Sequence, residues 1–424
     1  MNLYNSLKKI EDSGKIFIKE VAMEKNNVSK YRWVVLIVYM FVAALTQLYW
    51  LNFAAIDTYL ENNLNLSAMK VGFLTTVFPL LFVILSIPAG IIIDKKGYKF
   101  GVGIGTIFTG VFALMRLINP SSYAILLISQ IGISIGQPFV LNGITKLAVT
   151  WFPKKEEATA VGLGSLSLFL GMIIGLGVTP ALVESLGFET MLLIYGIIGV
   201  ISIPIFYIFT KTKVPVSEDK LNEQEISYID GIKKIYRIRD FILLGIVAFI
   251  GIGVFNGLLT WLEKILNETH GFSMQQAGNI SSMLVFSGMI GCIIIPMLSD
   301  KFMKRKPFLM IASLVGIITI TIMIFARGFT INAINAIVMG FFVVSTLPII
   351  LTMSEEIAGE KFAGIGAAFL QLLGNGAAVL IVPIMEALHS ATGKYTLSLS
   401  MLVALFGVLF IIVLFMGETY KKRV

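Results

Sequence analysis

The sequence predicts an all-α membrane protein with twelve transmembrane helices in two six-helix bundles. Three observations support this fold class: the apolar content, the spacing of the apolar runs and the positions of the basic residues. Of 424 residues, 57% are hydrophobic and only 14% are charged, and the mean hydropathy is +0.88. Because a membrane-spanning helix needs roughly 20 mostly apolar residues, this composition predicts about twelve spans. It excludes a water-soluble enzyme and a disordered protein.

The apolar runs give the expected spans in chain order. The first six lie near residues 33–58, 70–93, 98–118, 122–151, 157–182 and 187–210. The last six lie near residues 240–266, 274–299, 307–327, 330–353, 359–388 and 395–417. We therefore expect an N-terminal tail (1–32), an N-terminal bundle (33–210), a linker (211–239), a C-terminal bundle (240–417) and a C-terminal tail (418–424).

The linker is the longest polar segment, and its second half has a helical pattern. Its isoleucines recur at helical spacing beside basic residues: Ile226, Ile229, Ile232 and Ile235 with Lys233, Lys234 and Arg237. This pattern predicts an amphipathic helix on the membrane surface. A solvated linker helix is an equal alternative.

Basic residues are concentrated on one side of the expected spans. Of the 33 Lys and Arg residues, 27 fall in the two tails, the linker and the loops on the side of the tails. By the positive-inside rule, both termini are cytosolic. Residues 1–32 lack an apolar run, which indicates a cytosolic tail rather than a signal peptide. The Lys- and Ile-rich composition favours a prokaryotic chain and hence the cell (inner) membrane.

The two halves repeat one pattern. Asp94 and Asp300, which follow the second and eighth spans, are 206 positions apart. Arg116 and Arg327, which end the third and ninth spans, are 211 positions apart. Parallel six-span repeats define a class of secondary transporters whose substrate site lies at the repeat interface near the membrane midplane.

The segment after the second span carries a family resemblance. It reads Gly90-Ile-Ile-Ile-Asp94-Lys-Lys-Gly97-Tyr-Lys99 and resembles the G-x-x-x-D-R-x-G-R-R signature of the major facilitator superfamily. Asp94 at a helix end can accept backbone amides or a basic partner, and Gly97 allows a tight turn. The resemblance implies alternating access, with Gly90, Asp94, Gly97 and Asp300 helping to close the cytosolic side. In the second copy Pro296 and Met303 replace the glycines.

A narrower resemblance rests on three separated stretches. The first stretch runs from Gln137 to Ala160 and begins Gln-Pro-Phe. The second runs from Trp50 to Ile56 and begins Trp-Leu-Asn. The third runs from Phe255 to Leu266 and begins Phe-Asn. Together they are similar to the family of the feline leukaemia virus subgroup C receptors and their bacterial relatives. Characterised members of that family are linked to choline and ethanolamine, to vitamin-like cations and to heme.

The amine site of that family resembles an aromatic cage completed by amides. Trp50 matches the cage tryptophan, and Asn375 falls where a family glutamine lies in span eleven. Two positions depart from the pattern: Phe169 stands where the family has a glutamine, and Asn256 stands where it has a tyrosine. One amide and one aromatic ring have thus exchanged positions, so the resemblance does not imply that choline itself is the substrate.

The residues alone also predict a cavity. Gln137, Phe169, Asn256, Gln371 and Asn375 fall near mid-membrane. Amides there are costly unless they pair with one another or face a water-filled cavity. They either line a binding site or hold the bundle together through interhelical hydrogen bonds. The ring of Trp50 would attract a cation, and Asn52 and Asn142 complete the predicted substrate-binding set.

Acidic residues near the outer ends constrain the coupling of transport. Asp57, Glu263 and Glu386 lie there, and no Asp or Glu is expected at mid-membrane. This favours facilitated diffusion or electrogenic uptake of a cation, unless Asp57 or Glu263 is drawn into the cavity as a coupling residue. Both could instead be solvated. His270 and His389 are expected on the surface, in outer loops.

We expect a secondary transporter for a small polar solute, an organic cation of the choline or vitamin type, that works by alternating access. The alternatives are a non-transporting receptor or sensor on the same fold, a lipid flippase, and a proton-coupled efflux pump. The drug–proton antiporter pattern is absent from residues 162–180. We expect a monomer in the lipid bilayer with a small-molecule substrate, no nucleic-acid partner, no cofactor, no metal and no enzymatic activity. The single cysteine, Cys292, allows no disulfide within the chain.

Overall fold

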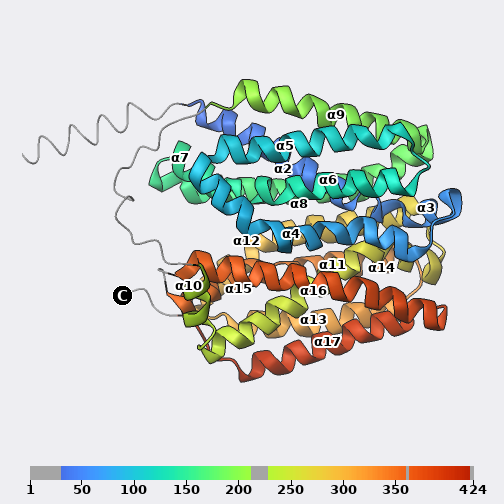
Figure 1. The fold of residues 1–424 in the computed structure, drawn as a ribbon. Coiled ribbons are helices and arrows are strands. Elements are labelled where there is room, and N and C mark those ends of the chain that lie inside the picture. Colours follow the sequence, from blue (N-terminus) through green and yellow to red (C-terminus); the bar gives the residue numbers. More distant parts are fainter. Residues whose placement is uncertain (1–29, 212–227, 360–361, 421–424) are drawn as a thin grey trace, which may run out of the picture.

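The computed structural model describes residues 30–211, 228–359 and 362–420, and its long helices run side by side in two groups (Figure 1). Twelve helices of this described part are long and apolar enough to cross a membrane. The predicted fold class is confirmed. The predicted tail residues 1–29 and 421–424, linker residues 212–227 and residues 360–361 at the start of span eleven lie outside the described residues.

The N-terminal bundle holds six of these spans and one short extra helix. Its helices are α2 (Arg32–Leu51), α3 (Asp57–Leu64), α4 (Ala68–Lys96), α5 (Tyr98–Met115), α6 (Tyr123–Leu141), α7 (Gly143–Trp151), α8 (Lys154–Leu186) and α9 (Phe188–Phe209). A 3₁₀ turn (Ala54–Ile56) joins α2 to α3, and another (Arg116–Ile118) follows α5. The fourth span consists of α6 and α7.

The C-terminal bundle holds the other six spans. Its helices are α11 (Arg239–His270), α12 (Met274–Phe302), α13 (Lys306–Phe325), α14 (Phe329–Met339), α15 (Thr346–Ala358), α16 (Ala363–Thr392) and α17 (Thr396–Phe415), with a π-helical segment (Gly340–Val344) between α14 and α15. We call the end of the molecule that carries α7, α10 and the C-terminal end of the chain the terminal side, and the opposite end, which carries α3, the α3 side (Figure 1).

The predicted linker helix is present as α10 (Tyr228–Ile235). Ile235 is buried, and a side chain at Gly231 would collide with Ile365 of α16. Lys233 and Lys234 are exposed on the other face. The helix therefore packs its apolar face on the C-terminal bundle, while Ile226 of the predicted pattern lies outside the described residues.

Two predicted spans are interrupted where a side chain supplies a hydrogen bond to the backbone. The first span was expected to reach residue 58, but α2 ends at Leu51, and the carbonyl of Tyr49 accepts a hydrogen bond from Gln130 Nε2 (3.4 Å). A helix end leaves such carbonyls without helical partners. The fourth span breaks at Asn142, whose Nδ2 donates to the carbonyl of Ser86 on α4 (2.8 Å).

The tenth span contains the π-helical segment, and a proline lies just after it. Pro348 has no backbone N–H, so the carbonyl of Val344 loses its helical partner. The thiol of Cys292 on α12 donates to that carbonyl instead, at a Sγ–O distance of 3.6 Å. The cross-helix bond satisfies a group that would otherwise be unpaired inside the bundle.

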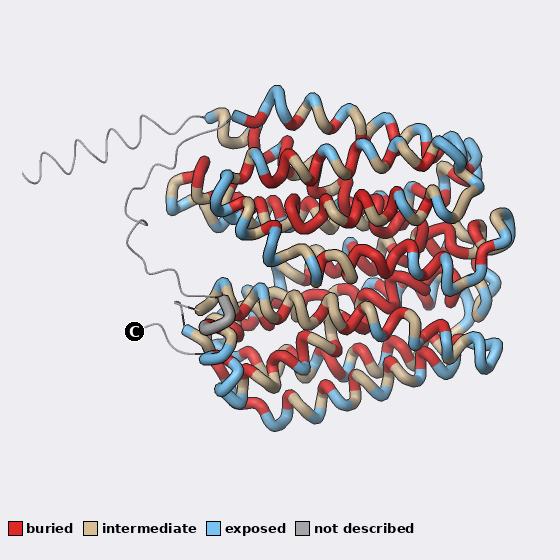
Figure 2. The backbone as a smooth tube through the Cα atoms, viewed as in Figure 1, coloured by how far each residue is buried: buried red, intermediate tan, exposed pale blue. Residues whose placement is uncertain are grey.

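Apolar side chains cover the outside of the molecule, and small residues let the helices approach one another inside it. Ile37, Ile118 and Phe325 are exposed, as expected of helices that face lipid, while buried positions face inward (Figure 2). Between α2 and α8, a Cβ atom at Gly171 would overlap the backbone of Ala44. Close backbone approach of this kind drives helix association in membranes.

Gly171→Val should therefore lower the stability of the folded protein. Overpacking of a close helix contact costs about 1–3 kcal/mol, so we expect a fall of several degrees in the melting temperature of the purified protein in detergent. Gly407→Ala on α17 is the control, because a Cβ there meets no atom within 4 Å. A Gly171 variant as stable as the wild type would contradict this account of the α2–α8 contact.

Candidate substrate-binding site

A cavity of about 500 Å³ lies between the two bundles. Helices from both halves line it: α2, α4, α6 and α8 on one side, and α11, α12, α15 and α16 on the other. Its lining reaches toward the terminal side along Ser165 of α8 and Leu351 of α15. Its volume is within the range of ligand pockets, and it lies at the repeat interface, where transporters of this architecture bind substrate.

The structure brings six of the eight predicted substrate-binding residues to this cavity. They are Trp50, Gln137, Phe169, Asn256, Gln371 and Asn375. Asn52 is fully buried, with no hydrogen-bond partner for its amide atoms, and Asn142 is used in the break between α6 and α7. Neither Asn52 nor Asn142 is among the lining residues.

Several polar lining residues were not predicted. Gln47, Ser165, Cys292 and Thr346 also face the cavity. A sequence signal existed for Gln47, because it precedes Trp50 by three positions and so shares its helix face. Thr346 and Cys292 carry no comparable signal, since their position depends on the π-helical segment and on the packing of α12 against it.

The cavity offers hydrogen-bond acceptors and aromatic faces, and none of the described residues that line it is charged. Asn256 donates its Nδ2 to the carbonyl of Ile252 (2.8 Å), and Asn375 donates its Nδ2 to the carbonyl of Gln371 (2.9 Å). Their Oδ1 atoms are left as acceptors for a bound molecule. The lining also contains the ring of Trp50, whose buried Nε1 has no partner. Such a surface suits a donor-bearing or cationic ligand.

Polar contacts close the cavity on the α3 side. Glu263 Oε2 accepts hydrogen bonds from the backbone N and the Oγ1 of Thr58, both at 3.0 Å. Lys264 Nζ lies 2.6 Å from Glu61 Oε1. Both contacts join α3 of the first bundle to α11 of the second. On the same side, Ser282 Oγ of α12 donates to the carbonyl of Ile173 on α8 (3.1 Å).

The two candidate coupling residues belong to this closure. Asp57 and Glu263 are 1% and 2% exposed, so the expectation that they could be solvated is wrong in this conformation. Neither is among the residues that line the cavity. The carboxylates are held at the bundle interface because α3 folds back over the end of α11.

On the terminal side, the predicted gating segment of the N-terminal half is uncovered. Gly97 ends α4 with a φ of +84°, which confirms the tight turn expected there. Asp94 Oδ1 lies 3.5 Å from Lys146 Nζ, and the Asp94 side chain is 74% exposed. A Cβ at Gly90 would meet no atom within 4 Å. The exposed acid thus has one long ion pair, while Ile93 of the same segment is buried against Gly101 of α5.

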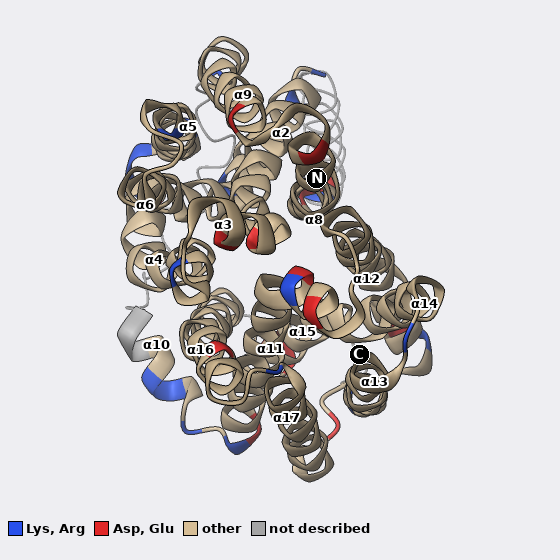
Figure 3. Cartoon of the chain, turned by 90° about the vertical axis from the view of Figure 1, so that its right-hand side faces the viewer, with Lys and Arg blue, Asp and Glu red and all other residues tan. Residues whose placement is uncertain are grey.

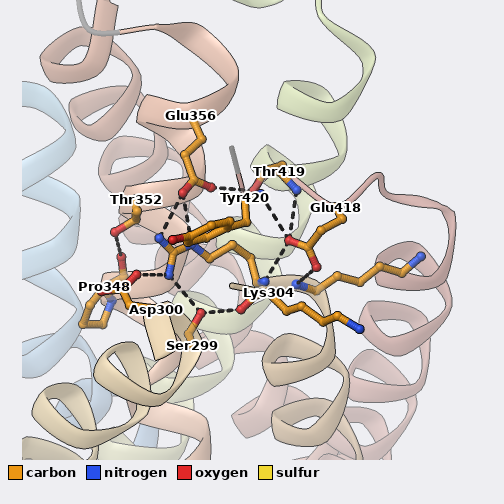
Figure 4. A network of polar contacts seen from close by, with 11 residues as sticks. Ser299, Asp300, Lys304, Pro348, Thr352, Glu356, Glu418, Thr419 and Tyr420 are labelled. Atoms are coloured by element: carbon orange, nitrogen blue, oxygen red, sulfur yellow. Dashed lines mark hydrogen bonds and ion pairs between the residues drawn. The ribbon is translucent and has the colours of Figure 1, made fainter. Parts of the chain in front are cut away.

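The counterpart in the C-terminal half is embedded in a polar network (Figure 4). Arg305 Nη1 lies 2.6 Å from Asp300 Oδ1, and Arg305 Nη2 lies 3.0 Å from Glu356 Oε1. The backbone N of Arg305 donates to Glu418 Oε1 (2.8 Å). Met303, which occupies the position of Gly97 in the repeat, also has a positive φ (+55°), but with a ψ of 41° where Gly97 has 162°.

The expectation that both histidines lie in outer surface loops is wrong. Helices α11 and α16 extend past their predicted ends to His270 and Thr392, so both side chains belong to packed helix ends. His389 Nε2 lies 2.8 Å from Glu268 Oε2, and its ring stacks on Tyr395 at a centroid distance of 4.1 Å. His270 Nε2 lies 2.9 Å from the carbonyl of Met323.

Comparison with known proteins decides the family. Residues 34–383 match the Major Facilitator Superfamily. The chain belongs to the major facilitator superfamily. Members of this superfamily are membrane transporters, so the chain is a multi-pass transporter of small molecules and not an enzyme.

The similar proteins agree with this assignment. The choline/ethanolamine transporter FLVCR2 of Rattus norvegicus is 25% identical over 365 residues, which cover 81% of this chain and 67% of that protein. An uncharacterised protein of Archaeoglobus fulgidus is 34% identical over 216 residues, covering 51% of this chain and 96% of that protein. The inward-facing, occupied structure of a bacterial homologue of the human lysosomal transporter Spinster has a TM-score of 0.72 at 16% identity. It covers 91% of this chain and 97% of that one, and shows the same fold.

Cys292 can serve as a probe of the side from which the cavity is reached, because it lines the cavity whose lining extends toward the terminal side. A maleimide that cannot cross membranes should label Cys292 in sealed vesicles that expose a C-terminal tag, because the thiol lines the cavity. It should not label vesicles of the opposite orientation. Cys292→Ser removes the only thiol in the chain and is the control. Faster labelling in the opposite orientation would contradict the direction in which the cavity opens.

Proposed function

We propose that the chain is a secondary transporter that carries a small organic cation, a choline-like or vitamin-like amine, by alternating access. One observation carries this proposal: an uncharged cavity between the two bundles presents the ring of Trp50 together with the free acceptors of Asn256 and Asn375. The choline/ethanolamine transporters among the relatives support the amine class.

The cavity recognises a cation without a carboxylate. An ammonium group over the ring of Trp50 gains about 0.5–2 kcal/mol from the ring quadrupole. Hydrogen bonds from the ammonium or a neighbouring hydroxyl to the amide oxygens fix its orientation. Because no carboxylate holds the cation, it can leave the site, and the membrane potential of about 2.3 kcal/mol per charge per 100 mV drives its uptake.

The departures from the family pattern affect which amine is carried. Phe169 and Asn256 both line the cavity, from α8 and α11 respectively. The exchange therefore keeps one ring and one amide at the site, but here the N-terminal bundle supplies the ring and the C-terminal bundle supplies the amide. We expect a substrate that shares the ammonium group of choline while differing in the part that contacts α8.

We infer the orientation in the membrane from the basic residues, and the conformation from the side toward which the cavity lining extends. From the positive-inside bias we infer that the terminal side is cytosolic, and from the Lys- and Ile-rich composition that the membrane is the cell membrane. The structure then represents an inward-open state. When the cytosolic side closes, the exposed segment from Gly90 to Gly97 meets the C-terminal bundle and Asp94 gains a partner there.

Binding can be tested by thermal shift with choline, ethanolamine, other amines, B vitamins, sugars and organic anions. A ligand that binds the folded state raises the melting temperature by mass action. We expect stabilisation by an amine, weakened up to about thirtyfold in apparent affinity in Trp50→Ala because 2 kcal/mol of cation–π energy is lost.

Trp33→Ala is the matched control for this prediction. Trp33 lies on the same helix but packs against Phe152, away from the cavity. It should leave the ligand affinity unchanged. Stabilisation by a sugar or an anion, with no effect of amines, would refute the cation proposal while leaving the fold assignment intact.

Asp94→Asn tests transport against a sensor on the same fold. A transporter must close its cytosolic side in every cycle, so uptake of the amine into proteoliposomes should fall at least tenfold while the thermal shift by that amine is kept. Glu189→Gln, an exposed change on the α3 side, should leave uptake unchanged. Full uptake by the Asp94 variant would show that this segment is not a gate.

A further inference from the structure

Eight titratable side chains gather on the α3 side, where α3 of the first bundle packs against α11 of the second and α11 packs against α16. Figure 3 shows acidic positions on α3 beside the boundary between the bundles. The group contains five acids, two bases and one tyrosine: Asp57, Glu61, Glu263, Glu268, Glu386, Lys264, His389 and Tyr395. Acids outnumber bases even when His389 is protonated.

Three of the five carboxylates have partners that suit an ionised group. Glu61 pairs with Lys264 at 2.6 Å. Glu268 lies 2.8 Å from His389 Nε2 and 3.9 Å from Lys264 Nζ. Glu386 accepts hydrogen bonds from the hydroxyls of Tyr395 (3.2 Å) and Ser390 (3.0 Å). The cations of the group are therefore used by other acids.

The remaining two carboxylates, Asp57 and Glu263, lie on opposite bundles and have no cationic partner, although Glu263 Oε2 accepts two hydrogen bonds from Thr58. In the described part of the chain no Lys, Arg or His nitrogen lies within 4.0 Å of either. Asp57 Oδ1 and Glu263 Oε1 are cut off from solvent and have no hydrogen-bond partner. The two groups, with Glu61, are near enough to repel one another when charged.

A buried carboxylate with no cation beside it is disfavoured in its ionised form and favours the protonated one. Two carboxylates that share a site cannot both ionise readily. Loss of the last proton would place like charges on α3 and α11, and their repulsion would oppose the contact that the hydrogen bonds from Thr58 to Glu263 hold. The contact between the bundles thus depends on the protonation of this pair.

We propose that Asp57 and Glu263 form a proton-binding site that holds at least one proton while the α3 side is closed and releases it when that side opens. Among the described residues, no three His, Cys, Asp or Glu side chains converge to hold a metal ion, so the arrangement suits a proton. The site is separate from the substrate cavity and does not rest on the proposed substrate.

The proposal predicts how pH shifts the conformational equilibrium. At low pH the pair is neutral and the α3 side stays closed. As the pH rises, ionisation favours the state in which water reaches the two carboxylates, and the equilibrium shifts toward opening by up to tenfold per pH unit for each proton released. Fixed neutral side chains at these positions should abolish the shift.

The experiment measures the distance between two spin labels across the α3 side in the full chain, with no substrate present. In a Cys292→Ser background, Asn119→Cys and Lys394→Cys place one label on each bundle, at exposed positions. From about pH 5.5 to about pH 8.5 we expect a longer distance to replace the shorter one. Glu263→Gln and Asp57→Asn should each keep the shorter distance throughout.

Glu189→Gln is the matched control, because Glu189 is an exposed acid on the same side and should leave the pH response intact. A distance in the parent that does not change with pH overturns the proposal. So does a pH response that persists in both neutral variants, or a response to sodium at fixed pH in place of a response to pH. If one variant does not purify as a monodisperse protein, the other decides. Because no substrate is present, a failed amine assay does not affect the result.

Discussion

The structure depends on one constraint: inside a bilayer, every backbone polar group must find a partner within the protein. Unbroken helices meet this demand, and so do the breaks. The carbonyl of Tyr49 at the end of α2 takes a hydrogen bond from Gln130, and the carbonyl of Val344, freed by Pro348, takes one from Cys292. Trp50, Leu141 and Val344, at or beside these breaks, line the cavity. Irregular backbone at membrane depth is found where protein, not lipid, surrounds it.

Much of the fold and part of the site could be predicted from sequence, because the bilayer imposes a length and an apolarity on each span. The twelve spans are confirmed, and the amides expected to be costly at mid-membrane, such as Gln137 and Asn375, do line a cavity. Asn52 and Asn142 do not line the cavity, because each directly follows a helix end, at Leu51 and Leu141, that the sequence did not reveal. His389 could not be placed because the extension of α16 by a further turn is determined by its packing against Tyr395 and Glu268.

The two repeats share a backbone plan and differ in how their side chains are used. Gly97 and Met303 both have a positive φ, but Met303 is in the left-handed helical region (ψ 41°) while Gly97 is in an extended one (ψ 162°) that suits a residue without a side chain. Arg116 is fully buried against the rings of Tyr49 and Phe53, whereas its counterpart Arg327 is exposed. Asp94 has one long ion pair and Asp300 lies in a network. The segment at Asp94 in the first half is therefore held by fewer polar contacts than the corresponding segment at Asp300 in the second half.

The bond between Cys292 and Val344 has a mechanical consequence. Elsewhere along a helix, successive turns are tied by amide donors, but here the tie is a thiol on another helix, a weaker donor at 3.6 Å. The tenth span therefore has a pliable joint at half its length, directly beside the cavity. Its two segments can change their angle at lower energetic cost than an unbroken helix would require. Because Val344 lines the cavity, a bound molecule contacts the span at this point.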